Sequence, residues 1–140
     1  MPPTTASADS AYLLLKTALI FAGSGLGGVC RYLLAGWTQR WAGAAFPLGT
    51  LLVNLTGCLL IGFLTAALAG RWLVREEYRL ALTIGVLGGF TTFSSFGLET
   101  FALLNDGQYA RAALNVGGSV VLGLVAVWIG YRLAERWLGV

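Results

Sequence analysis

The residues best suited to bind a ligand interrupt an apolar stretch. The segment GGFTTFSSF at residues 88–96 contains two glycines, four hydroxyl side chains and three phenylalanines. Hydroxyl groups donate hydrogen bonds, and a phenylalanine ring has a positive edge because of its quadrupole. Such groups favour an anion as ligand. Taken alone, however, Phe93 and Phe96 at helical spacing would more often be core residues.

Two further polar side chains lie in apolar surroundings. Asn54 is part of GTLLVNLTGCLLIG at 49–62, and Ser119 is part of NVGGSVVLG at 115–123. A buried amide without a partner is costly in hydrocarbon. Asn54 must therefore contact another helix, a water-filled cavity or a ligand. Helix contact and ligand contact are equally compatible with its position in the sequence.

The elements that carry these side chains are expected to be membrane-spanning helices. Hydrophobic residues make up 57% of the 140 residues and charged residues only 11%, which is far from the composition of a soluble domain. A bilayer core of about 30 Å requires roughly 20 helical residues. We expect an all-α membrane protein with four transmembrane helices, at residues 12–36, 47–69, 79–103 and 111–132.

The first of these spans carries charges. Lys16 near its start and Arg31 near its end can each extend toward an interface. A cleaved signal peptide is the competing interpretation, but the N-terminus lacks a basic segment and the apolar stretch is too long. We expect residues 1–10, rich in Pro, Ser and Thr, to be a disordered tail and residues 11–140 to form one four-helix domain.

The third span is expected to break near its middle. Glycine has low helix propensity, and hydroxyl side chains compete for backbone hydrogen bonds. Non-helical backbone at that depth is tolerated where protein or a cavity surrounds it, and broken helices often present backbone groups to ions. A helix that is merely kinked is the simpler alternative.

Polar groups from all four spans are expected at similar depths. With about 1.5 Å of rise per residue, six side chains fall within or close to one half of the bilayer: Arg31, Asn54, Phe93, Phe96, Glu99 and Ser119. No acidic residue lies at the centre of a span, which argues against a cation pathway or a proton relay.

Several functions are poorly supported by the composition. The chain has no histidine and only two cysteines, so it lacks the usual ligands of a transition-metal site and the usual general base. We expect no enzymatic activity. The arginines are scattered, which argues against nucleic-acid binding.

Three segments together are similar to one family. GGVCRYLL at 27–34, GTLLVNLTGCLLIG and GVLGGFTTFSSFGLET at 85–100 resemble the Fluc (CrcB) fluoride channels, and the resemblance covers all four spans. It implies an antiparallel, dual-topology homodimer in the lipid bilayer of the cell inner membrane. Two pores per dimer would let fluoride leave passively and so protect the cell from fluoride toxicity.

The resemblance also implies roles for particular residues. Phe93 and Phe96, contributed by different subunits, would offer ring edges to fluoride. Further residues of the fluoride pathway would be Asn54, Ser119, Thr92, Ser95 and Glu99. A structural sodium ion (Na+) at the dimer interface would be held by the backbone carbonyls of Gly88 and Thr91. Apart from the resemblance, the charge and depth of Arg31 predict either a vestibule residue that attracts anions or the structural partner of Glu99.

The distribution of basic residues departs from this expectation. An antiparallel homodimer requires little charge bias between its two membrane faces. The basic residues expected on the face of the termini are Lys16, Arg71, Arg75, Arg79, Arg132 and Arg136. The opposite face has only Arg40, Arg111 and Arg31. The positive-inside rule alone would place both termini in the cytoplasm. Either another factor sets the orientation or a homologous partner subunit exists. A small multidrug-type transporter and a purely structural membrane subunit are the alternative functions.

Overall fold

Four long helices make up the fold. The computed structural model describes residues 5–43, 46–69 and 74–139. Helices α1 (Thr5–Ala42), α2 (Leu48–Ala69) and α6 (Tyr109–Leu138) are continuous. The third span consists of α3 (Glu76–Leu80), the π-helix η1 (Ala81–Leu87), α4 (Gly88–Phe90) and α5 (Phe93–Asn105).

The four spans expected from the sequence are confirmed. Four segments are long and apolar enough to cross a membrane: Asp9–Trp41, Leu48–Ala69, Glu76–Asn105 and Tyr109–Leu138. Three of them are longer than expected, because the helices continue past the first charged residues into the interfacial regions. The described residues contain no strand.

The beginning of α1 differs from the expectation of a tail over residues 1–10. The helix begins at Thr5, and residues 1–4 lie outside the described part of the chain. Alanines at positions 6, 8 and 11 explain the difference. Alanine has the highest helix propensity, so the span continues toward the N-terminus without a barrier.

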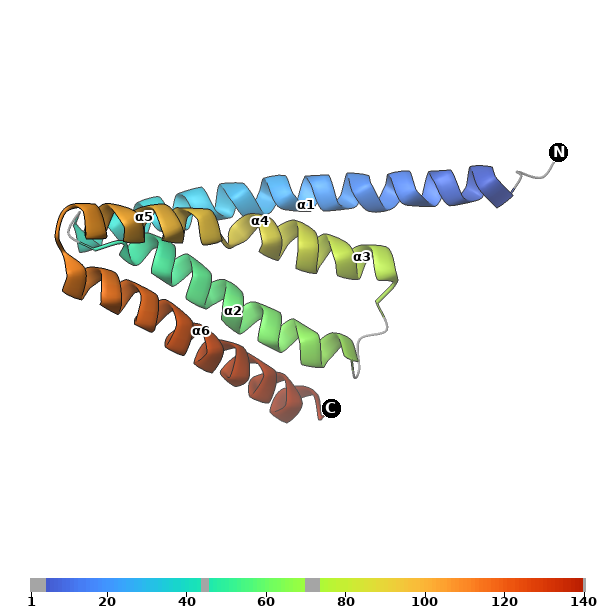
Figure 1. The fold of residues 1–140 in the computed structure, drawn as a ribbon. Coiled ribbons are helices and arrows are strands. Elements are labelled where there is room, and N and C mark those ends of the chain that lie inside the picture. The colour runs from blue at the N-terminus through green and yellow to red at the C-terminus, as the bar shows by residue number, and fades with distance from the viewer. Residues whose placement is uncertain (1–4, 44–45, 70–73, 140) are drawn as a thin grey trace.

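The helices associate as two pairs. In Figure 1, α1 lies along the third span and α2 lies beside α6. Glycines allow the close approach, as small residues do in membrane proteins. A Cβ atom on Gly27 would overlap the carbonyl oxygen of Val86, and one on Gly62 would overlap that of Val127. These two glycines therefore allow the helices to pack closely.

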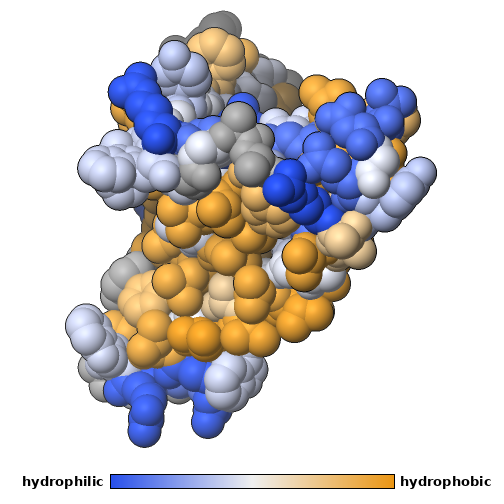
Figure 2. Space-filling model, turned by 90° about the vertical axis from the view of Figure 1, so that its left-hand side faces the viewer, coloured by the Kyte–Doolittle hydropathy of each residue, from blue (hydrophilic) through white to orange (hydrophobic). Residues whose placement is uncertain are grey.

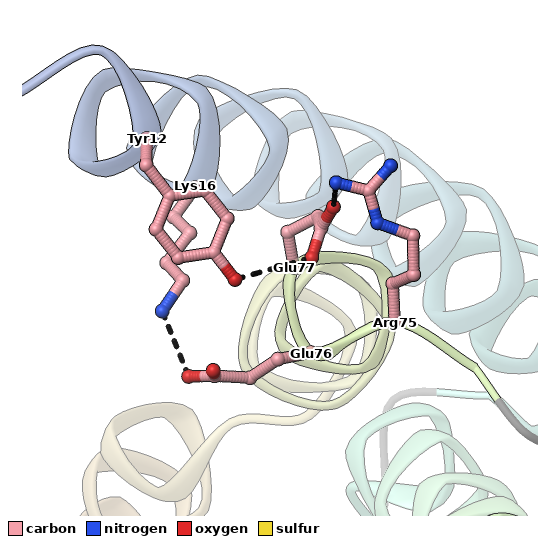
Figure 3. Close-up of polar contacts among 5 residues, drawn as sticks. All are labelled: Tyr12, Lys16, Arg75, Glu76 and Glu77. Carbon is pink, nitrogen blue, oxygen red and sulfur yellow. Dashed lines mark hydrogen bonds and ion pairs between the residues drawn. The ribbon is translucent and has the colours of Figure 1, made fainter. Parts of the chain in front are cut away.

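The two pairs meet at one end of the molecule and separate toward the other. They converge where α2 and α6 begin, and they diverge toward the end where α1 begins and α6 ends. At the diverging end, an ion pair and a hydrogen bond join α1 to the start of the third span (Figure 3). Lys16 pairs with Glu76 at 2.8 Å, and Tyr12 Oη donates to Glu77 at 3.3 Å. Arg71 lies outside the described residues.

The outer surface suits a lipid environment. Large apolar side chains are exposed along the spans, and tryptophans lie near opposite ends, with Trp41 80% and Trp137 84% exposed. Tryptophan is enriched at membrane interfaces because its ring is amphipathic. Figure 2 shows a continuous hydrophobic area between hydrophilic residues above and below it.

Candidate functional site

The third span is interrupted at Thr91 and Thr92. Both residues have extended backbone angles, with φ −82° and ψ 159° at Thr91 and φ −151° and ψ 120° at Thr92. Helix α5 then begins at Phe93, and the backbone N–H of Ser95 donates to Thr92 Oγ1 at 3.2 Å. Threonine is a favourable N-cap because its hydroxyl accepts such a bond. The hydroxyl residues of this segment therefore begin a new helix.

Asn54 supports the interruption from α2. Its Nδ2 donates to the carbonyl of Thr92 at 3.0 Å, and its Oδ1 accepts from the Thr92 N–H at 2.9 Å. The amide thus replaces both hydrogen bonds that the backbone of Thr92 would make inside a helix. These contacts support the helix-contact interpretation of Asn54. The Nδ2 group carries a second proton that this pair of bonds does not use.

The same contact changes the hydrogen bonding of the preceding turn. In a continuous α-helix, the N–H of Thr92 would donate to the carbonyl of Gly88. It donates to Asn54 instead. The N–H of Thr91 donates to Leu87 at 2.9 Å, so the regular pattern ends there. Carbonyl groups at the end of α4 therefore lose the backbone N–H donors that a continuous helix would supply.

Phe93 and Phe96 lie just after the interruption. Their ring centroids are 5.6 Å apart, and the ring planes are inclined at 44°. Phe93 is 83% exposed, whereas Phe96 is partly covered. A phenylalanine with that exposure contributes little to the hydrophobic core.

A cleft lies between α2 and the third span. Its volume is about 340 Å³, and it is lined by Asn54 and Cys58 from α2 and by Leu87, Thr91 and Phe93, among others, from the third span. One side of the interruption therefore faces open space, although Thr92 itself is buried.

One further cavity adjoins the interruption, and another lies closer to the converging end of the molecule. The first, of about 290 Å³, is lined by Arg31, Thr50, Thr92 and Ser95. The other, of about 540 Å³, lies at the converging end and includes Thr50 and Glu99 in its lining. Thr92 lines both the cleft and the smaller cavity, and Thr50 lines both cavities. The smaller cavity thus shares lining residues with the cleft and with the larger cavity, whereas the cleft and the larger cavity share none.

Glu99 is held by α2. Thr50 Oγ1 donates to its Oε1 at 2.6 Å, whereas its buried Oε2 has no hydrogen-bond partner within the described part of the chain. Arg31 lines a different cavity. The ion pairs among residues 5–43, 46–69 and 74–139 are Lys16–Glu76, Arg75–Glu77 and Arg132–Glu135, so Arg31 and Glu99 are not paired there.

Ser119 presents an unsatisfied group. Its Oγ is buried and lacks a hydrogen-bond partner among the described residues. One turn earlier on α6, Asn115 is 2% exposed and donates to Thr100 Oγ1 at 2.9 Å. A buried hydroxyl without a partner is unusual, so Ser119 has a hydrogen-bond donor that the described residues leave unused.

Sequence reasoning missed three polar residues that contact the expected ones. Thr50 precedes Asn54 by four residues, Asn115 precedes Ser119 by four, and Thr100 follows Phe96 by four. Residues at this spacing share a helix face. The four-residue spacing from an expected residue could have indicated these three residues. It could not indicate which residues on neighbouring helices they contact.

Comparison with known proteins decides the family. The family model described as "CrcB-like protein, Camphor Resistance (CrcB)" matches residues 18–131. The chain belongs to the CrcB-like protein family. This confirms the resemblance to Fluc (CrcB) proteins, and with four helices long enough to span, the chain is a multi-pass membrane protein.

Relatives of this CrcB-like chain have informative names. The "Fluoride-specific ion channel FluC" of Geobacter sulfurreducens is 53% identical over 111 residues, which cover 79% of this chain and 90% of that protein. The protein of the same name from Solibacter usitatus is 46% identical over 122 residues, covering 87% of this chain and all of that protein. "Fluoride-specific ion channel FluC 2" of Symbiobacterium thermophilum is 42% identical over 118 residues, with 84% and 96% covered.

Proposed function

We propose that this protein is a passive, fluoride-selective ion channel that exports fluoride through the inner membrane and protects the cell from fluoride toxicity. The observation that carries the proposal is the support of Thr92 by Asn54 next to Phe93 and Phe96, in a chain of the CrcB-like family. The names of its relatives favour fluoride as the ion.

The available donors suit a small anion. The second N–H of Asn54, the hydroxyl of Ser119 and the edges of the phenylalanine rings each carry partial positive charge. Fluoride is small and strongly hydrated, so it needs short, directional contacts to replace part of its water shell. Chloride is larger and gains less from each contact. A narrow path with such donors therefore favours fluoride.

The conducting unit we propose is an antiparallel homodimer with two pores. Phe93 is 83% exposed and lies beside an open cleft. Both observations support a second copy of the chain that covers this surface. In this arrangement Phe93 of one subunit and Phe96 of the other provide ring edges to the same pore. The path continues along Thr92, Ser95, Asn54, Ser119 and Glu99. Arg31 raises the local anion concentration in the vestibule.

The proposal includes a structural sodium ion at the dimer interface. Hard cations prefer oxygen ligands. The Thr92 N–H, which would bond to the Gly88 carbonyl in a continuous helix, donates to Asn54 instead. The carbonyls of Gly88 and Thr91 are therefore suitable ligands, because two antiparallel copies would bring two such sets together. The carbonyl dipoles would coordinate the ion, which would stabilise the interface without taking part in conduction.

Fluoride efflux from liposomes tests the function. Purified protein is reconstituted in potassium fluoride, and release is followed with a fluoride electrode after a potassium ionophore removes the electrical limit. Fast fluoride release with negligible chloride release is expected. Absence of release from folded, dimeric protein would contradict the proposal and favour the transporter or structural-subunit alternatives.

Labelling tests the antiparallel arrangement. A cysteine replaces the exposed Asn105 at the end of α5 in a variant without Cys30 and Cys58. An impermeant thiol reagent applied to one side of sealed vesicles should label half of the subunits, and permeabilised vesicles should label all. Complete labelling from one side of oriented membranes would instead indicate a single orientation and a homologous partner.

A further inference from the structure

A chain of two hydrogen bonds connects α6 to the backbone of Phe96. Asn115 on α6 donates through Nδ2 to Thr100 Oγ1 at 2.9 Å. Thr100 in turn donates to the carbonyl of Phe96 at 2.7 Å. The hydroxyl of Thr100 is therefore both acceptor and donor, and its proton position is fixed by Asn115. The arrangement links a neighbouring helix to the turn that carries the ring.

Thr100 differs in this respect from other threonines of the chain. Thr17, Thr38, Thr65 and Thr83 each donate to a carbonyl three or four residues earlier in their own helix. Thr100 makes the same intrahelical bond but also accepts from α6. The common bond alone does not require the asparagine, so the additional contact needs its own explanation.

The burial of the Asn115 amide at this position costs free energy. Asn115 is 2% exposed, and the other buried residues of α6 are alanines and glycines. A leucine would fill similar space without the cost of removing an amide from water. Polar contacts of this kind can fix one arrangement of helices at the expense of stability.

Besides the hydrogen bond from Thr50 of α2 to Glu99, helix α5 has little buried surface that determines its rotation. Leu103 is its only buried residue, and the interruption at Thr91 and Thr92 separates it from the preceding helix. A continuous helix would transmit the orientation of α4, whereas an interrupted one cannot. The bond from Asn115 thus acts where apolar packing is weakest, one turn from Phe96.

We propose that Asn115 and Thr100 are positioning residues that set the rotation of α5 and so the direction of the Phe96 ring edge. The inference rests on the proposed function, in which Phe96 contacts fluoride. Asn115 acts through Thr100 and does not itself need to touch the ion. Because a misplacement of about 1 Å can cost up to ~100-fold in rate at an enzyme site, small rotations are expected to matter here.

Fluoride efflux of variants at both positions tests the proposal. Thr100→Val keeps the shape of the side chain and removes its hydroxyl, and Asn115→Leu removes the amide. Each is expected to lower fluoride efflux by roughly tenfold or more and to raise the ratio of chloride to fluoride release. The double variant should be no slower than the slower single variant, because residues in one network are not additive.

Two further variants separate positioning from general stability. Thr100→Ser restores the hydroxyl and is expected to recover most of the fluoride efflux. Thr65→Val removes an equivalent intrahelical bond far from α5 and should leave efflux and selectivity unchanged. Thr100→Ala replaces Thr100→Val if the latter is not recovered as folded dimer.

The outcomes distinguish the two hypotheses. Wild-type protein without fluoride efflux would overturn the proposed function itself. Wild-type efflux together with unchanged rate and selectivity in Thr100→Val and Asn115→Leu would overturn only the positioning role. Strictly additive losses, or failure of Thr100→Ser to recover efflux, would also contradict it.

Discussion

The side chain of Asn54 and the backbone of Thr92 are joined by two hydrogen bonds of 2.9 and 3.0 Å. One amide therefore satisfies both the N–H and the carbonyl of a residue that lies outside the regular helix. In hydrocarbon, each of these groups would otherwise lack a partner. The contact makes an interruption at this depth energetically acceptable and places a polar side chain beside the phenylalanines.

Asn54→Leu is expected to abolish fluoride efflux and to destabilise the protein. The substitution leaves two backbone groups of Thr92 unpaired, at about 1–3 kcal/mol each. Thermal unfolding in detergent and efflux from liposomes measure the two effects. As a control, Asn105→Leu at the exposed end of α5 should change neither. Normal efflux in Asn54→Leu would show that Thr92 does not depend on this amide.

Phe96→Ile is expected to reduce fluoride efflux sharply. Isoleucine retains much of the bulk but lacks the positive ring edge. Stability should change little, because the side chain is only partly covered. Efflux is compared with that of Phe101→Ile, which alters an exposed ring of the same helix. Equal rates in the two variants would argue against ring-edge coordination.

Arg31→Ala is expected to slow fluoride efflux while the dimer remains intact. Its guanidinium lines the cavity beside Ser95 and Thr92, where positive charge attracts anions. The effect should shrink as ionic strength rises, since salt screens the field. Efflux at low and high potassium sulfate measures this. Loss of folded protein would instead indicate a structural role.

Gly27→Ala is expected to disrupt packing between α1 and the third span. The added methyl group would overlap the carbonyl oxygen of Val86 and lie 2.8 Å from the backbone nitrogen of Phe90. Gly25 has open space around it, so Gly25→Ala is the matched control. Melting temperature should fall only in the first variant. A fall of equal size in both would contradict the packing assignment.

Glu77→Gln is expected to lower stability but not the efflux of each folded channel. The carboxylate is 2% exposed and pairs with Arg75 at 2.5 Å. The amide keeps the size and the contact with Tyr12 but loses the charge. A cost of about 1–3 kcal/mol follows from a weakened buried contact. Melting temperature and efflux per dimer are measured together, and reduced efflux per dimer would assign this cluster a role in conduction.

The number and approximate position of the spans follow from the sequence alone. Each bilayer crossing requires about 20 apolar residues, and few other physical requirements produce such runs. The same reasoning predicts a weak point near the middle of the third span, because glycines and hydroxyl residues weaken a helix locally. Helix α1 begins at Thr5, before the predicted start of the first span, and the high helix propensity of alanine accounts for the difference. Local chemistry is sufficient for predictions of this kind.

The partners of the polar residues are decided only by the tertiary structure. Spans that are apolar on every side carry no periodic signal that tells which face meets a neighbour. The contacts of Asn54 with Thr92, of Thr50 with Glu99 and of Asn115 with Thr100 depend on the rotation and separation of whole helices. Those quantities are set by glycine contacts distributed over α1, α2, α6 and the third span, so no single segment encodes them.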